Sequence, residues 1–295
     1  RWRGASAGSR RIRTRTRTSA GGVARVNGTE LHYDVAGDGP PLVLLHAGVG
    51  DRRLWDEQMD AFAERFRVVR YDARGFGDSP LPGGPFSFVD DLCAIIDHLG
   101  LERVALVGNS LGARTALEHA LIHAERTSAL VLVGAPPMGA PSSAELEAFD
   151  TEEDALLEAG KLEEAVELNL HTWLADDVAP ALRARVGEMQ RRAFELQLAA
   201  YSREPEPGPV GWLDDPPVWE RLGDVGCPTL ILVGDRDVSD MDVVADRLAA
   251  GIAGARKVVM PGAGHVPGCE RPAEFNRIVL EFVAGVFEPQ ATGSS

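Results

Sequence analysis

The chain has 295 residues, of which 44% are hydrophobic and 25% are charged, so it has enough apolar residues for a sizeable core. It contains no apolar run of about 18 residues or more, and we predict no membrane-spanning helix and no membrane partner. The net charge of −15 would repel phosphate backbones, which argues against nucleic acid as a partner. Three cysteines, Cys93, Cys227 and Cys269, stand far apart without a CxxC pair, so no disulfide framework or zinc knuckle is expected. This cysteine usage is typical of a reducing compartment, and we predict a cytoplasmic protein.

Positive charge is concentrated at the start of the chain. Residues 1–25 contain eight arginines and no acidic residue. No apolar segment follows the pair Arg10–Arg11, so the pattern does not predict a secretory signal. We expect residues 1–22 to be a disordered basic tail and residues 289–295 to be a short C-terminal tail.

Strand-like and helix-like patterns alternate along most of the remaining chain. A hairpin is predicted from residues 23–26 and 30–35, because the Asn27-Gly28 pair between them favours a tight turn. Amphipathic patterns such as 88–99 and 275–283 indicate helices. Apolar runs typical of strands buried on both faces follow the hairpin at 41–46, 67–71, 104–108, 129–134, 229–234 and 256–260. This alternation predicts an α/β fold with an eight-stranded, mostly parallel sheet and helices on both faces.

One interval breaks the alternation. Residues 140–226 contain no predicted strand, but they show helical patterns at 152–168 and 182–200 and a proline-rich segment at 204–209. An insertion of this length is too long for a loop. We therefore expect a helical cap over residues 140–226, between two parts of one core at 23–139 and 227–288.

The pentapeptide Gly108–Gly112 carries the strongest chemical signal. Its sequence is G-x-S-x-G, and it lies between a predicted strand and a predicted helix. In that context the sharp turn needs small flanking residues and raises the Ser110 hydroxyl above the sheet. Ser110 is therefore a candidate nucleophile.

A serine hydroxyl needs a general base, and the base needs an orienting acid. The strand at 229–234 is followed by Asp235 and Asp237, and the strand at 256–260 is followed by His265. All three lie after carboxyl ends of strands, where sites of open α/β sheets assemble. We prefer Asp237 as the acid because Asp235, directly after Gly234, is typical of a turn.

An ester-cleaving serine also needs backbone donors for the oxyanion of its intermediate. The N–H of Leu111, at the start of the helix after Ser110, is one candidate. The loop at residues 46–50 should supply the other, because its small residues let the backbone approach a ligand.

With these motifs the chain resembles the α/β-hydrolase-fold serine hydrolases over about residues 23–287. The resemblance includes the His46-Ala47-Gly48 loop, the D-x-R-G-x-G-x-S stretch at 72–79, and the G-x-G-H at 262–265. It implies Ser110 as nucleophile, Asp237 as acid, His265 as base, and the N–H groups of Gly48 and Leu111 as the oxyanion hole. Ala47 stands where the family usually has glycine.

Within that family the capped layout resembles small esterases and the 3-oxoadipate enol-lactonase group. The Gly108-Asn109-Ser110 sequence is also similar to carbon–carbon bond hydrolases of ring-fission diketo acids. Those enzymes usually carry Gly-Pro-Gly in the oxyanion loop and a Trp soon after the catalytic histidine. This chain has Gly48-Val49-Gly50 and Val266-Pro267 instead.

The other notable residues give weaker signals. His119 and His123 lie four apart on a helix, but without a third ligand we interpret them as packing or surface residues. Trp173 and His171 of the cap, together with Val266, are candidates for the substrate pocket. Cys269 is interpreted as a buried structural thiol.

We therefore predict a serine hydrolase that cleaves a small carboxylic ester or lactone through an acyl-enzyme. This chemistry needs neither metal nor cofactor, and the predicted partner is a small-molecule substrate, with monomer and homodimer both left open. A carbon–carbon bond hydrolase, or a ligand-binding protein that has stopped catalysing, are the alternatives.

Overall fold

A computed structural model describes residues 20–287 of the chain. Its strands are β1 (Ala20–Val26), β2 (Thr29–Ala36), β3 (Pro41–Leu45), β4 (Arg67–Tyr71), β5 (Gly84–Phe86), β6 (Val104–Asn109), β7 (Thr127–Val133), β8 (Pro207–Val210), β9 (Thr229–Gly234) and β10 (Arg256–Met260). Its α-helices are α1 (Asp56–Phe62), α2 (Phe88–His98), α3 (Leu111–Ile122), α4 (Ala144–Glu158), α5 (Leu162–Trp173), α6 (Pro180–Tyr201), α7 (Ser239–Gly251), α8 (Pro267–Glu270) and α9 (Pro272–Phe287).

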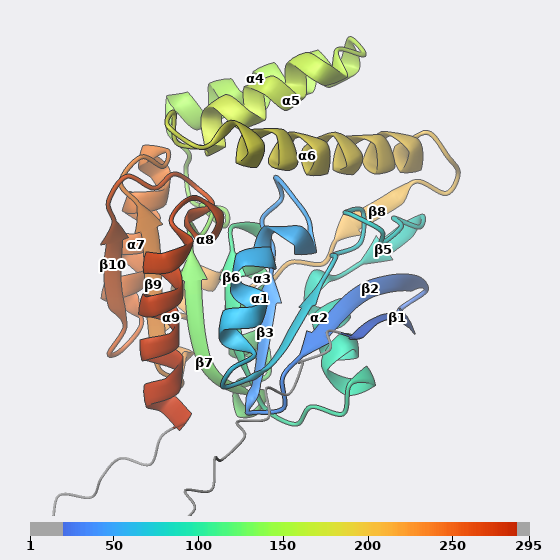
Figure 1. The fold of residues 1–295 in the computed structure, drawn as a ribbon. Coiled ribbons are helices and arrows are strands. Elements are labelled where there is room, and N and C mark those ends of the chain that lie inside the picture. The colour runs from blue at the N-terminus through green and yellow to red at the C-terminus, as the bar shows by residue number, and fades with distance from the viewer. Residues whose placement is uncertain (1–19, 288–295) are drawn as a thin grey trace, which may run out of the picture.

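The main sheet has eight strands in the order β1-β2-β4-β3-β6-β7-β9-β10. The pairs β1–β2 and β2–β4 are antiparallel, and all other neighbours in this sheet are parallel. The predicted eight-stranded, mostly parallel sheet is therefore confirmed. Because β3, β6, β7, β9 and β10 run parallel, their carboxyl ends meet along one edge, below the cap in Figure 1.

Helices cover both faces of this sheet, and each face has its own apolar core. Side chains of α2, α3 and α7 pack on one face, where Leu92, Leu117 and Leu248 are fully buried. On the other face α1 and α9 lie side by side, with Phe62 and Phe275 inside the core. The central strands β6, β7 and β9 are buried along their whole length, which explains their continuous apolar runs.

The first hairpin forms as predicted, but it begins earlier than expected. Asn27 and Gly28 both adopt positive φ angles, 47° and 71°, as a tight hairpin turn requires. Residues 20–22 belong to β1 and pair with β2, so they are not part of a tail. The remaining residues of the two predicted tails, 1–19 and 289–295, lie outside the described residues.

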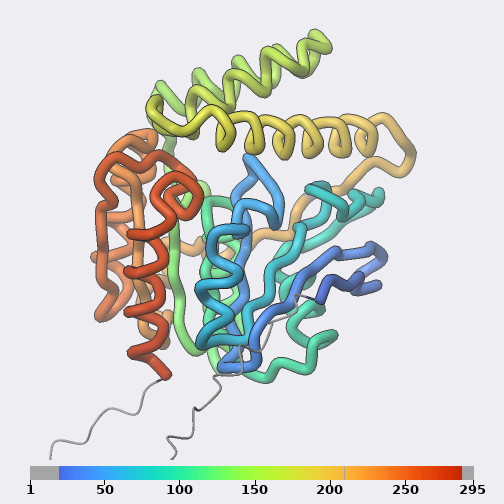
Figure 2. Tube along the Cα trace, viewed as in Figure 1, coloured from blue at the N-terminus to red at the C-terminus, as the bar shows by residue number. Residues whose placement is uncertain are grey.

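Helices α4, α5 and α6 form an insert between β7 and β9, and they lie across the carboxyl ends of the strands as a cap (Figures 1 and 2). The stretch predicted as helical at 152–168 is helical except at residues 159–161, where the chain turns between α4 and α5 and Gly160 has a φ of 70°. The proline-rich segment was not predicted as a strand, yet β8 pairs with β5 in a small parallel sheet. Proline has no N–H group to pair with a neighbouring strand, so strands that contain proline are short. Strands as short as β5 and β8 give no recognisable sequence pattern.

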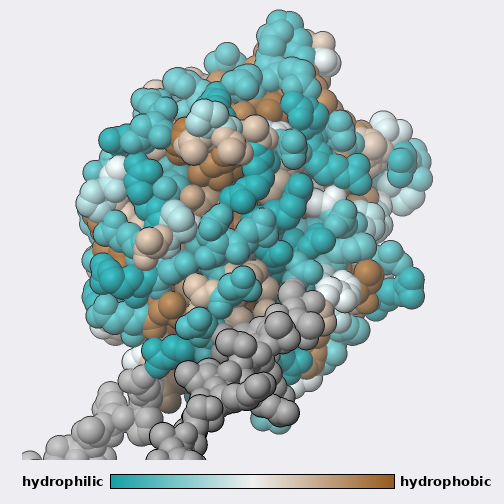
Figure 3. Space-filling view, viewed as in Figure 1, coloured by the Kyte–Doolittle hydropathy of each residue, from teal (hydrophilic) through white to brown (hydrophobic). Residues whose placement is uncertain are grey.

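No helix between residues 20 and 287 is long and apolar enough to cross a membrane. On the face drawn in Figure 3, hydrophilic residues predominate and hydrophobic ones form small separate patches.

Burial of His119 makes the stability of the fold depend on pH. His119 on α3 is fully buried, its Nδ1 lies 3.0 Å from Thr127 Oγ1, and its Nε2 has no hydrogen-bond partner. Burial, assisted by the nearby His123 and Arg126, lowers the pKa of His119 to about 3 from its ordinary 6.5. Below pH 6.5 His119 is therefore protonated in the unfolded chain but stays neutral in the folded chain, so the free energy of unfolding decreases as the pH falls toward 3.

Between about pH 7.5 and pH 5 we expect protonation of His119 in the unfolded chain to lower the wild-type free energy of unfolding by about 2 kcal/mol. His119→Gln should not show this loss. Urea unfolding at the two pH values measures this difference. His123→Gln, one helical turn away at a half-buried position, should lose as much stability as the wild type. An equal pH dependence for wild type and His119→Gln would contradict the prediction.

Candidate functional site

Ser110 lies in the turn between β6 and α3, with a φ of 53° and a ψ of −112°. Few residues other than glycine adopt such angles, so the backbone is strained at this position. Neither Gly108 nor Gly112 leaves room for a side chain. A Cβ on Gly108 would lie 2.1 Å from Gly112 O, and a Cβ on Gly112 would lie 2.3 Å from Leu45 O. The sequence G-x-S-x-G thus forms the sharp turn that its context predicts.

His265 and Asp237 form a buried pair on the loops after β10 and β9. The distances from His265 Nδ1 to the two carboxylate oxygens of Asp237 are 3.0 and 2.9 Å. The side chains are 2% and 1% exposed, and the N–H of Val238 donates to Asp237 Oδ1. Because Nδ1 faces a carboxylate, it carries the ring proton, and Nε2 is left as the basic nitrogen.

Asp235 lies apart from this pair. It is exposed, and its Oδ1 accepts the N–H of Gly262 at 2.6 Å. The structure thus places Asp235 in a turn contact between the two loops and brings Asp237, not Asp235, to His265.

Asn109 connects the serine turn to the histidine loop. Its Nδ2 donates to His265 O at 3.0 Å and to Val133 O at 3.3 Å, and Val133 O also accepts the N–H of Ser110. Asn109 is buried, so these bonds are shielded from water. The carboxyl ends of β6 and β7 and the loop that carries His265 are therefore held in one hydrogen-bonded unit.

The loop after β3 is held against the serine turn by His46. Its carbonyl oxygen accepts the N–H of Gly112, and its ring bridges two backbone groups. The N–H of Ala73 donates to His46 Nε2 at 3.0 Å, so Nδ1 carries the proton and donates to Ala47 O at 2.8 Å. His46 therefore supports the loop containing Gly48, at which a Cβ would meet no atom within 4 Å.

The D-x-R-G-x-G-x-S stretch at 72–79 is hydrogen-bonded to the loop after β3 through Asp72 and Ala73. Asp72 accepts the N–H groups of Arg52 and Asp78 and forms an ion pair with the Arg52 side chain. Burial raises the pKa of Asp72, an effect that Arg52 and these N–H groups oppose. A Cβ on Gly77 would lie 2.4 Å from the Asp72 carboxylate, so glycine is needed there. Sequence reasoning matched this stretch to a family pattern without finding its bracing role.

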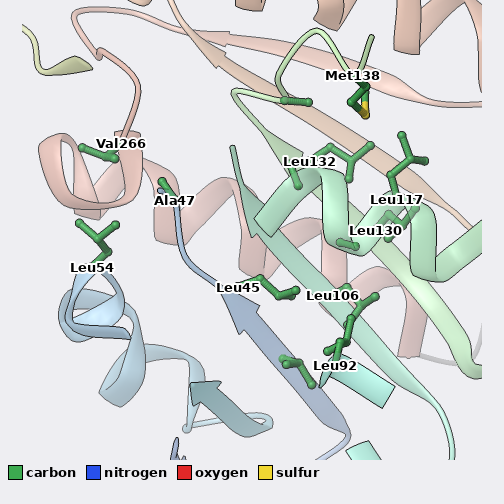
Figure 4. Close-up of a cluster of buried hydrophobic side chains, with 14 of the residues drawn as sticks. Leu45, Ala47, Leu54, Leu92, Leu106, Leu117, Leu130, Leu132, Met138 and Val266 are labelled. Carbon is green, nitrogen blue, oxygen red and sulfur yellow. The ribbon is translucent and has the colours of Figure 1, made fainter. Parts of the chain in front are cut away.

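The surroundings of His265 are largely apolar. The centroids of the Trp173 and His265 rings lie 4.5 Å apart, and the Phe149 ring packs edge-on against Trp173 with a centroid distance of 5.1 Å. Figure 4 shows Val266 close to Ala47 of the His46 loop and Leu54. Of the three predicted pocket residues, the structure brings Trp173 and Val266 to this region. His171 is exposed on α5, because the buried face of that helix is formed by other residues.

Two further residues have structural surroundings. Cys269 is buried, and its thiol donates to Leu54 O at 2.9 Å. Burial raises the pKa of this thiol to about 12, so it stays protonated near neutral pH. The rings of His119 and His123 lie against each other, 5.2 Å apart, and no cluster of three or more metal-ligating side chains occurs between residues 20 and 287.

Comparison with known families identifies the group to which this architecture belongs. Residues 42–278 match the model of the alpha/beta hydrolase family, and they include the serine turn, Asp237 and His265. The chain belongs to the alpha/beta hydrolase family. This alpha/beta hydrolase is 32% identical over 274 residues to a 2-hydroxy-6-oxononadienedioate/2-hydroxy-6-oxononatrienedioate hydrolase from Burkholderia vietnamiensis, covering 87% of this chain and 92% of the relative.

Two solved structures are similar over nearly the whole described chain. The enol-lactonase from Burkholderia xenovorans LB400 superposes with a TM-score of 0.75 at 26% identity, covering 89% of this chain and 100% of that one. A thermophilic esterase from Thermogutta terrifontis has a TM-score of 0.75 at 25% identity, covering 92% and 100%. An enol-lactonase, an esterase and an oxononadienedioate hydrolase are named for different substrates, so the comparisons establish a hydrolase and leave its substrate to the chemistry of the site.

Proposed function

We propose that the protein is a serine hydrolase that cleaves a small carboxylic ester or lactone through an acyl-enzyme. Ser110 is the nucleophile, His265 the general base and Asp237 the acid that orients it. The N–H groups of Leu111 and Gly48 form the oxyanion hole. The observation that carries the proposal is the buried His265–Asp237 pair, hydrogen-bonded through Asn109 to the strained turn at Ser110.

The proton path follows from the tautomer of His265. Ser110 Oγ attacks the carbonyl carbon while its proton moves to His265 Nε2, and the carbonyl oxygen takes the negative charge. Collapse of this intermediate breaks the bond to the leaving oxygen, which receives the proton from Nε2. Water then repeats the two steps on the acyl-enzyme and releases the acid and free Ser110. The Asp237 carboxylate stays ionised and stabilises the imidazolium in both halves.

Two structural features support Leu111 and Gly48 as oxyanion donors. Leu111 is the first residue of α3, so its N–H has no carbonyl one turn earlier to bond. Gly48 lies in the loop that His46 fixes against Gly112. Such preorganised donors stabilise developing charge without reorganising during the reaction.

The apolar surroundings favour a small uncharged substrate. Trp173, Phe149 and Val266 belong to the apolar groups around His265, and the cap lies over the strand ends. Esters and lactones fit this setting, and the names of the enol-lactonase and the thermophilic esterase agree with it.

A second candidate is a hydrolase of ring-fission diketo acids, in which the same serine turn cleaves a carbon–carbon bond. The 32% identity to the oxononadienedioate hydrolase supports it. Against it stand Val49 in the oxyanion loop and Val266 after His265, where such hydrolases usually have proline and tryptophan.

The homodimer and the cytoplasmic location stay predictions.

The test is hydrolysis of p-nitrophenyl esters from acetyl to decanoyl, combined with fluorophosphonate labelling of wild type and Ser110→Ala. We expect turnover that is highest for short acyl chains, and a label that the variant does not take up. Labelling of Ser110 without ester turnover would move the proposal to the diketo-acid substrate. Absence of both labelling and turnover would indicate a protein that binds ligands without catalysis.

Gly134, directly after β7, leaves room for the His265–Asp237 pair. Its φ is 49°, and a Cβ there would lie 3.0 Å from His265 Nδ1 and 3.3 Å from Asp237 Oδ2. We expect Gly134→Ala to lower kcat/KM for the best ester by roughly 10²-fold, because a small displacement of a catalytic group is costly.

The matched control is Gly139→Ala in the same connection. Its φ is also positive, 83°, but a Cβ there meets no atom within 4 Å. Both variants should lose about 1 kcal/mol of stability from the backbone strain. Only Gly134→Ala should lose activity, and equal activities would contradict the assigned contact.

A further inference from the structure

Glu270 is a buried carboxylate that the proposed mechanism does not use. It is the last residue of α8, five positions after His265, and only 7% of it is exposed. A buried carboxylate is costly unless its oxygens are hydrogen-bonded. Both oxygens of Glu270 are bonded, and every donor is a backbone N–H group.

These donors lie on both sides of His265 and on the cap. The N–H groups of Gly264 and Ala175 donate to Glu270 Oε2 at 2.9 and 3.2 Å, and that of Val266 donates to Oε1 at 3.2 Å. The N–H between them, that of His265, donates to Trp173 O at 2.9 Å. Three consecutive N–H groups of the histidine loop are therefore fixed, two by one carboxylate and one by the cap.

The neighbouring glycine shows how close this approach is. A Cβ on Gly264 would lie 2.7 Å from Ala175 N, 3.1 Å from Trp173 O and 3.1 Å from Glu270 Oε1. Glycine before the histidine is thus required so that the cap segment and the carboxylate can both reach the loop. The Trp173 ring against the His265 ring completes the contact between cap and loop.

We propose that Glu270 is a positioning residue, whose carboxylate locks the His265 loop to the cap segment 173–175 and so fixes His265 for catalysis. The inference rests on the proposed role of His265 as the base. The Glu270 carboxylate is hydrogen-bonded to backbone N–H groups and not to Ser110 or the His265 ring, so it acts by holding the backbone on both sides of the imidazole. Because the same oxygen binds Gly264 and Ala175, docking of the cap and placement of the base depend on each other.

Glu270→Gln separates this role from simple burial, because an amide has one acceptor oxygen and presents donors on the other side. The amide oxygen can satisfy either Val266 or the pair Gly264 and Ala175, and its NH₂ group then faces an N–H group. We expect kcat and the rate of fluorophosphonate labelling to fall roughly 10- to 100-fold, with KM changed less than about twofold.

Glu118→Gln is the matched control. Glu118, eight positions after Ser110, is a buried carboxylate that accepts the N–H of Leu213, on the chain that leaves the cap, and the Nε–H of Arg114. We expect that variant to lose stability while its labelling rate stays within about twofold of wild type. Both variants are assayed at a temperature at which circular dichroism shows them folded.

If Glu270→Gln does not fold, Glu270→Asp decides, since it keeps the charge but is one methylene too short to reach all three N–H groups. A folded Glu270 variant with the labelling rate of Glu118→Gln would overturn the inference. Failure of the proposed function gives a different result, in which Ser110→Ala keeps activity or wild type takes up no label.

Discussion

Ser110→Ala is expected to lower kcat for ester hydrolysis by roughly 10⁴-fold or more, since removal of the nucleophile disables the whole triad. It should leave the stability nearly unchanged, because alanine at a φ of 53° and a ψ of −112° meets the same backbone strain as serine. The side-chain hydroxyl contributes to chemistry, and the strained turn is what exposes it.

Ser110→Gly should be equally inactive and more stable than Ser110→Ala by about 1 kcal/mol, because glycine adopts these angles without strain. Urea unfolding of the two variants measures the difference. Ala159→Gly, at an ordinary φ of −77°, is the control and should be destabilised by about 0.5–1 kcal/mol. A Ser110→Gly variant that is less stable than Ser110→Ala would show that the turn carries no strain.

The sequence predicted the sheet because strands buried on both faces leave a strong pattern. Residues 104–108 and 229–234 read as continuous apolar runs, and the structure buries β6 and β9 fully. The predicted order of Ser110, Asp237 and His265 also agrees with loops at the carboxyl edge of one sheet. Periodicity was sufficient for the strands because it is a local property. The grouping of the three residues came from the family resemblance and from the rule that sites assemble at the carboxyl ends of parallel strands.

Contacts between distant segments that no family motif states were not predicted. The two-stranded sheet of β5 and β8 joins residues more than a hundred positions apart, and prolines in both strands hide the pattern. Asp72 and Glu270 accept backbone N–H groups from other loops, and a sequence pattern does not state which loops meet. The glycine at 264 was a signal of close approach, but the carboxylate that approaches it was not identifiable without the fold.

Asp91→Asn is expected to destabilise the protein by about 3–5 kcal/mol, because it removes the negative charge of a buried ion pair and leaves the positive charge of Arg74 unpaired. Arg74, from the stretch at 72–79, is 4% exposed and Asp91 on α2 is 1% exposed. Two parallel hydrogen bonds of 2.6 Å join the guanidinium to the carboxylate, and Asn27 Nδ2 also donates to Asp91. The pair thus ties the brace of the oxyanion loop to α2 and to the first hairpin.

The control lies on the same helix. Asp97 forms an ion pair of 2.6 Å with Arg126, but its side chain is 66% exposed. Water and salt screen such a pair, so Asp97→Asn should change the free energy of unfolding by less than about 1 kcal/mol. Replacing both buried partners, as Arg74→Met with Asp91→Leu, should recover much of the stability lost in Asp91→Asn, because no unpaired charge stays buried. Equal losses for Asp91→Asn and Asp97→Asn would contradict the distinction between buried and exposed pairs on which this prediction depends.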